Sequence, residues 1–194
     1  MNFLAHIYLS FGDPNITLGN FMADSIRGKH YRNYPEPVQK GVLLHRAIDT
    51  FTDTHPIPRL SSKRLHSSYG HYSMVIVDIY YDHFLAVNWE SFSDTSLTSY
   101  TASFYQLLEE NLEWMPEAIQ RFAPYMIADN WLLNYRELDG IERVLKGMNR
   151  RTGHKSGMDK AILELREFYD EFEGEFTSFF DELVIFSRQK MTEL

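Results

Sequence analysis

The sequence contains no cysteine among its 194 residues. This absence excludes a disulfide framework, a thiolate-bound zinc or iron–sulfur centre, and a cysteine nucleophile. Histidine and carboxylate side chains are therefore the only strong metal ligands that the chain offers. Low-complexity segments are also absent, and 44% of the residues are hydrophobic, so the chain can bury a core. At about 150 residues per domain, we expect residues 1–194 to form a single domain.

Long apolar runs are missing as well. The most apolar stretch, residues 74–89, is interrupted by Asp78, Asp82 and His83, well short of the ~20 apolar residues that a membrane span requires. The opening MNFLAHIYLSF has no Lys or Arg before its apolar residues and no small-residue cleavage site after them, which argues against a secretory signal. We therefore expect a soluble protein without a membrane partner, and the cytoplasm as its compartment.

The formal net charge of −8 argues against nucleic-acid binding through the phosphate backbone. The positive charges nonetheless cluster in segments 27–32, 57–72 and 143–155. The last segment holds five Lys or Arg residues, with Glu142 as the only acidic neighbour. Either one face of an acidic protein is locally basic, or these are ordinary solvated loops and helix faces.

Strict alternation of apolar and polar residues over a strand length is hard to find, whereas helical spacing is common. One apolar stripe begins at Phe104, and another continues from Ile162 to Phe180 on a helix that starts near Asp159. The pattern predicts an all-α domain of about seven or eight helices. Val75–Val77 is the one place where a strand remains an alternative.

Ionisable side chains interrupt two of the predicted helices. In residues 38–54, His45, Asp49 and Asp53 recur every four residues and form one polar line along an apolar helix. In residues 74–87, Asp78 and Asp82 are again four residues apart, on a helix that is apolar nearly all round and so predicted to be buried. Buried carboxylates need cations, hydrogen-bond donors or a metal nearby.

The N-terminal part adds His6, Asn20 and Asp24 to these groups. His and Asp at helical spacing on several helices are typical of an oxygen-and-nitrogen metal site in a helical bundle, suited to Mn, Fe, Mg or Zn. Each group also has a simpler interpretation. His6 suits a hydrogen-bonded core histidine, Asp24 an ion pair with Arg27, and Asp49 or Asp53 an ion pair with Arg46.

Five motifs carry a resemblance across most of the chain. They are MNFLAH at 1–6, GN-x-x-AD-x-x-RG at 19–28, HR-x-ID-x-x-TD at 45–53, D-x-x-x-DHF at 78–84 and WL-x-x-YR at 131–136. In this order and spacing they resemble the acyl carrier protein phosphodiesterase (acyl carrier protein hydrolase) family, a divergent HD-type phosphohydrolase group. The resemblance implies an all-helical, HD-phosphohydrolase-like bundle, dependent on a divalent cation with Mn²⁺ favoured and Fe²⁺, Mg²⁺ or Zn²⁺ as alternatives.

The resemblance also implies roles for particular residues. The expected metal ligands are His6, Asp24, His45, Asp49 and Asp82. Asp78 and His83 are expected as further ligands, as residues that support the ligands, or as proton donors. The chemistry needs a base for the attacking water, for which Asp49, Asp53 and Asp78 are the candidates, and an acid for the leaving serine oxygen, for which His83 is the candidate. Arg27, Lys29 and Arg46 stand beside these positions and are expected to neutralise the phosphodiester. The plain His-Asp dipeptide of ordinary HD enzymes is absent, and the reversed Asp82-His83 is the nearest match.

The activity that the resemblance implies is hydrolysis of holo acyl carrier protein to apo carrier protein and 4′-phosphopantetheine, within fatty acid and lipid metabolism. Carrier proteins are acidic, so a partner of this kind would approach one of the three basic segments. Two alternatives stay open at this point. One is an HD-type phosphohydrolase acting on a nucleotide or another small phosphoester, and the other is a non-catalytic helical protein whose buried His and Asp form only ion pairs.

Overall fold

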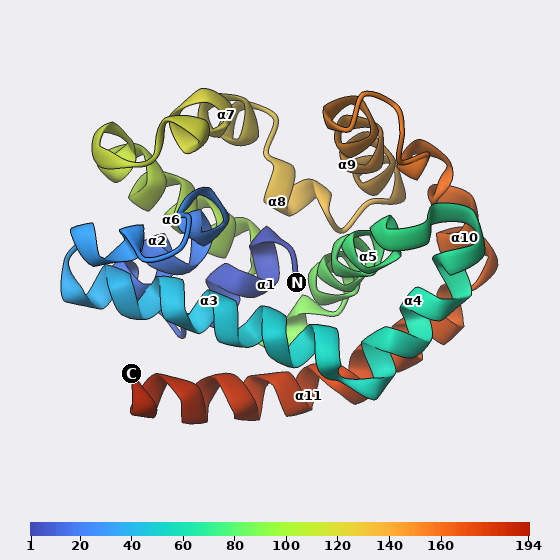
Figure 1. The fold of residues 1–194 in the computed structure, drawn as a ribbon, viewed down its shortest axis with the longest axis horizontal. Coiled ribbons are helices and arrows are strands. Elements are labelled where there is room, and N and C mark those ends of the chain that lie inside the picture. Colours follow the sequence, from blue (N-terminus) through green and yellow to red (C-terminus); the bar gives the residue numbers. More distant parts are fainter.

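The computed structural model describes residues 1–194, and helices make up most of it (Figure 1). The α-helices are α1 (Phe3–Tyr8), α2 (Pro14–Met22), α3 (Glu36–Thr54), α4 (Pro56–Tyr69), α5 (Ser73–Val87), α6 (Leu97–Asn111), α7 (Glu117–Ala128), α8 (Trp131–Asn134), α9 (Leu138–Arg151), α10 (Ile162–Glu167) and α11 (Tyr169–Glu193). The predicted all-α class is confirmed. The strand alternative at Val75–Val77 is wrong, because these residues lie inside α5.

The count of helices differs from the prediction. Seven or eight helices were predicted and eleven are present; eight of these have nine or more residues, and the other three, α1, α8 and α10, have six, four and six. Helices this short complete too few turns to show an apolar period. The predicted long final helix is broken at Phe168, where φ is −115° and ψ is 35°, so that α10 and α11 are separate.

Helices α2 and α3 pack with their backbones in contact. A Cβ atom on Gly19 would lie 2.1 Å from the carbonyl oxygen of Val38, and one on Gly41 would lie 2.2 Å from that of Ile16. No side chain fits at either position, so the two glycines allow the helices to meet. Asn20 follows Gly19 directly, and this close crossing brings it to the face of α3 that carries His45.

The core is one cluster of 46 buried hydrophobic residues. Helix α5 lies within it, and every residue from Ile79 to Ala86 is buried. The aromatic stripe of α11, which includes Phe172, Phe176 and Phe180, packs against α5 and α3. None of the helices combines the length and apolar character that crossing a bilayer would need.

The first residues of the chain lie at the centre of the molecule. In Figure 1 the N-terminus is placed between α1 and α5, below α8, while α3 and α11 run beside each other along one side. Helix α9 packs on α5. Between α9 and the N-terminal residues lies a cleft of about 1070 Å³.

Candidate metal centre

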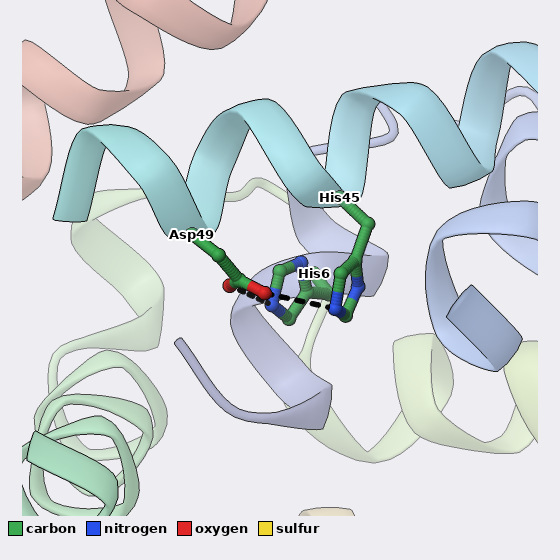
Figure 2. Close-up of side chains that lie close together, drawn as sticks. All are labelled: His6, His45 and Asp49. Atoms are coloured by element: carbon green, nitrogen blue, oxygen red, sulfur yellow. Dashed lines mark ion pairs between the residues drawn. The ribbon is translucent and has the colours of Figure 1, made fainter. Parts of the chain in front are cut away.

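His6 of α1 meets His45 and Asp49 of α3 (Figure 2). One ligand atom from each side chain lies within 4.8 Å of the others. The Nε2 atoms of His6 and His45 lie 3.2 Å and 3.1 Å from the two carboxylate oxygens of Asp49. The two imidazole rings are stacked, with centroids 3.8 Å apart and an interplanar angle of 15°. Three of the five predicted ligands therefore converge on one point.

Asn20 fixes the orientation of His45. The Nδ1 atom of His45 lies 2.8 Å from the carbonyl oxygen of Asn20, so this nitrogen donates and Nε2 is the one directed at the carboxylates. The side-chain amide of Asn20 in turn donates to the carbonyl oxygen of His6, at 2.7 Å. Asn20 of α2 thus holds the ring of His45, in the way that ligating imidazoles are usually held, and the backbone of α1 at His6.

Asp24 is the fourth member of the group. Its Oδ1 atom lies 3.2 Å from Nε2 of His45, while its side chain is largely exposed at the edge of the cleft. Burial lowers the pKa of His45, but the hydrogen bonds with Asp24 and Asp49 outweigh it and raise this pKa to about 9. Without a metal, His45 is therefore an imidazolium held between two carboxylates.

His6 is buried, its Nε2 faces only the carboxylate of Asp49, and its Nδ1 has no hydrogen-bond partner. Burial and the neighbouring charge of His45 lower its pKa to about 4, so His6 is neutral near pH 7. A buried ring nitrogen without a hydrogen-bond partner is costly, and neutral imidazole is the form that binds metals. The donors of His6, His45 and Asp49 therefore fit a divalent first-row ion.

The α-ammonium of Met1 lies beside this group. Its nitrogen is 3.0 Å from Oδ1 of Asp78 and 3.6 Å from Oδ1 of Asp49. Burial raises the pKa of Asp78 to about 6, although the ammonium opposes the shift. The pKa of Asp49 is held below its usual range, because its contacts with His45, His6 and the ammonium outweigh its burial. Asp78 is thus joined to the cluster through the ammonium and contacts neither histidine.

Asp82, predicted as a ligand, lies under the start of α1. Its Oδ2 accepts the backbone N–H of Leu4 at 2.7 Å, and its Oδ1 accepts those of Ala5 and Asn2 at 3.2 and 3.3 Å. Helix α1 has no side-chain cap of its own, and this fully buried carboxylate of α5 takes that role. Burial raises the pKa of Asp82 to about 7 against the Met1 ammonium and these N–H groups. The structure therefore does not bring Asp82 into the ligand group.

This placement changes the interpretation of the two aspartates of α5. Asp78 and Asp82 need positive charge nearby, and a metal between them was one way to supply it. The structure supplies it with the Met1 ammonium and the N-terminal N–H groups of α1.

His83, predicted to transfer protons, is occupied elsewhere. Its Nδ1 donates to the carbonyl oxygen of Tyr135 at 2.7 Å, and its Nε2 accepts from the hydroxyl of Tyr169 at 3.0 Å. The side chain is buried, and burial lowers its pKa. His83 thus connects α5 by hydrogen bonds to Tyr135 and Tyr169, and it does not line the cleft.

The predicted phosphate-binding cations also lie apart from the cluster. Arg46 donates to the carbonyl oxygen of Ile26 at 2.9 Å, and its guanidinium lies over the ring of Tyr31, 5.3 Å from the centroid. Arg27 and Lys29 are exposed and do not line the cleft. The ion pairs considered for Arg27 with Asp24, and for Arg46 with Asp49 or Asp53, do not form.

The cleft reaches this group through Asp49 and Asp24, with both histidines buried behind them, and α9 lies on its other side. Its acidic wall consists of Asp24, Asp49, Asp53 and Asp78, and its basic wall of Arg143, Lys146, Arg150 and Arg151. Apolar side chains, among them Val75, Ile79, Trp131, Val144 and Met148, lie between. The basic wall had only one signal in the sequence, the positive charge of segment 143–155.

The fold and the site define an all-helical protein with a buried His–His–Asp group, suited to a divalent ion, at the wall of a charged cleft. A sequence model of the acyl carrier protein phosphodiesterase family matches residues 1–183, and the chain belongs to this family. The resemblance drawn from the five motifs is thereby confirmed.

Relatives named acyl carrier protein phosphodiesterase match over nearly their full length. The protein of Photorhabdus laumondii is 34% identical over 93% of this chain and 91% of its own length. That of Pectobacterium atrosepticum is 30% identical over 95% and 96%, and that of Yersinia pestis 29% over 93% and 94%. No solved structure is significantly similar to the chain.

Proposed function

We propose that this protein hydrolyses the phosphodiester bond between the serine of holo acyl carrier protein and 4′-phosphopantetheine, with a divalent ion held by His6, His45 and Asp49. The relatives' shared name supports the substrate. The observation that carries the metal is His6, which is buried against the ring of His45 with its Nε2 directed at Asp49 and its Nδ1 unpartnered. A purely structural histidine at this depth would be hydrogen-bonded.

Two imidazole nitrogens and carboxylate oxygens, with Asp24 as a further donor, suit Mn²⁺, Fe²⁺, Mg²⁺ or Zn²⁺. We favour Mn²⁺ because the resemblance to the family implies it. When bound, such an ion lowers the pKa of a coordinated water and neutralises charge on the phosphodiester. The chain itself keeps His6 neutral, orients His45 through Asn20 and keeps Asp49 ionised.

The remaining carboxylates of the cleft suit proton transfer. Asp53 and Asp78 line the cleft beside the ligand group, and Asp53 forms no ion pair. Either is placed to accept the proton of an attacking water. We no longer assign a proton-transfer role to His83, because both of its nitrogens are used in hydrogen bonds outside the cleft.

The test is release of 4′-phosphopantetheine from holo carrier protein, followed by mass spectrometry. We expect release with Mn²⁺, loss of release with EDTA, and loss in His45→Ala. The exposed His30 lies outside the group, and His30→Ala is the matched control that should retain turnover. Release that persists in EDTA and in His45→Ala would refute the metal site. Turnover of a member of a nucleotide panel, with holo carrier protein left intact, would favour the small-phosphoester alternative instead.

A further inference from the structure

The α9 wall of the cleft carries positive charge that the protein leaves unneutralised. Arg143, Arg150 and Arg151 are exposed and line the cleft, and none of them forms an ion pair. Lys146 pairs only with Glu142, one turn earlier on the same helix, at 2.6 Å. Arg150 and Arg151 lie in the last turn of α9, where positive charge favours the helix, but this does not account for Arg143 or for the placement of all three on the wall of the cleft.

This wall stands out against the rest of the chain. The net charge is −8, so an acidic protein is repelled on average and must approach through a locally positive face. The opposite wall of the cleft, with Asp49, Asp53 and Asp78, is acidic and attracts a cation. The two walls thus suit different ligands, an ion on one side and an anionic partner on the other.

The other two basic segments are placed less well. Arg27 and Lys29 do not line the cleft. Arg59 and Lys63 of α4 border a separate hollow of about 670 Å³, which shares only Asp53 and Met74 with the cleft. Of the three segments, only 143–155 forms a wall of the cleft that Asp49 of the candidate metal centre lines.

A glycine interrupts the basic wall. Gly147 lies in the middle of α9 and lines the cleft, and a Cβ atom there would meet only Nη2 of Arg150, at 3.8 Å. No packing within the protein requires a glycine at this position, although glycine weakens a helix. Its absent side chain leaves a gap in the wall, with Arg143 on one side and Arg150 and Arg151 on the other.

We propose that α9 is the docking surface for a carboxylate-rich face of the carrier protein. Arg143, Arg150 and Arg151 pair with carboxylates around the modified serine, and the phosphopantetheine arm crosses the gap at Gly147 to reach His6 and the other candidate metal ligands. This assignment rests on the proposed function, because it takes the carrier protein as the partner.

The first test compares two charge reversals of equal size. Arg150→Glu alters α9, and Lys63→Glu alters α4 by the same two charges without removing the hydrogen bond from Arg59 to the backbone of Asp53. We expect the α9 variant to raise the KM for holo carrier protein and the Kd for apo carrier protein at least about tenfold, and to reduce the salt dependence of both. The α4 variant should stay within about twofold of the wild type. Mn²⁺ binding and circular dichroism verify that both variants remain folded.

The second test addresses the gap. Gly147→Leu should lower kcat/KM for holo carrier protein at least about tenfold, through the blocked arm, while the Kd for apo carrier protein stays near that of the wild type. Gly174 of α11 is also a helical glycine with open space around it, and Gly174→Leu is the matched control that should retain activity.

The outcomes separate this inference from the proposed function. If the wild type releases 4′-phosphopantetheine but the α9 reversal leaves KM and Kd unchanged, or the α4 reversal has the larger effect, the docking surface is wrong and the function stands. If Gly147→Leu and Gly174→Leu behave alike, the arm does not pass Gly147. If the wild type releases no 4′-phosphopantetheine from holo carrier protein, the proposed function is wrong, and so is the proposal that the carrier protein binds to α9.

Discussion

The substitution Asp82→Ala tests whether Asp82 is itself a metal ligand or a residue that positions the ligand His6. The carboxylate of Asp82 accepts three backbone N–H groups at the start of α1, and it is fully buried. Hydrogen bonds to charged groups contribute roughly 1.5–3 kcal/mol each, and removing the carboxylate also relieves part of the cost of burying it. We therefore expect the free energy of unfolding to fall by about 3–5 kcal/mol, a large part of the ~5–15 kcal/mol of a typical domain.

Losing the hydrogen bonds that anchor α1 should also weaken metal binding, although Asp82 does not contact the site. His6 follows the anchored residues Leu4 and Ala5 on α1, so loosening this helix displaces one of the candidate ligands. Asp82→Asn keeps the size of the side chain and one acceptor oxygen, and it should be intermediate in stability and still bind Mn²⁺.

The assays are urea unfolding, for the free energy, and titration with Mn²⁺, for the affinity. We expect Asp82→Ala to lose stability and Asp82→Asn to retain Mn²⁺ binding. Mn²⁺ binding abolished in both variants, with stability within about 1 kcal/mol of the wild type, would show that Asp82 is a ligand and that our interpretation of its contacts is wrong.

Three further predictions concern His45, Gly19 and Glu175. The pKa of His45 is raised to about 9, so Mn²⁺ binding must displace its proton. The Mn²⁺ affinity measured by titration calorimetry should therefore rise about tenfold per pH unit between pH 6 and 8. An affinity that does not change with pH would contradict this. Gly19→Ala would place a Cβ atom 2.1 Å from the carbonyl oxygen of Val38. The free energy of unfolding, measured by thermal unfolding, should fall by about 1–3 kcal/mol, and Mn²⁺ should bind more weakly. Stability and Mn²⁺ binding equal to those of the wild type would disprove the close crossing of α2 and α3. Glu175→Ala removes the half-buried bidentate ion pair with Arg64, whose two contacts are 2.6 and 2.9 Å long. The free energy of unfolding in urea should fall by about 1–3 kcal/mol, and the Mn²⁺ affinity should not change. A change in Mn²⁺ affinity would link α11 to the site.

The long helices were predictable because their apolar stripes repeat over several turns. The stripe from Phe172 to Phe180 indicates its helix without tertiary information, and Phe172, Phe176 and Phe180 all lie in the core. The break at Phe168 was not predictable, because an apolar period continues through it. Helix α1 has six residues, and the buried carboxylate of Asp82, distant in sequence, caps its start.

The candidate site was predictable where residues share a helix. The four-residue spacing of His45 and Asp49 places them on one face of α3, and the structure brings His6 to that face. The roles of Asp82 and His83 were not predictable, because a buried polar side chain is equally compatible with a metal, a helix N-terminus or a backbone carbonyl. The sequence contains the Asp and His but not the partner that the fold assigns to each.

The most direct test of the metal centre is anomalous diffraction, at the manganese edge, from crystals of the protein soaked in Mn²⁺. We expect one strong peak in contact with Nε2 of His6, Nε2 of His45 and the carboxylate of Asp49. A peak that contacts Asp82 or Asp78 but neither histidine, or no peak at all in crystals saturated with Mn²⁺, would contradict the site proposed here.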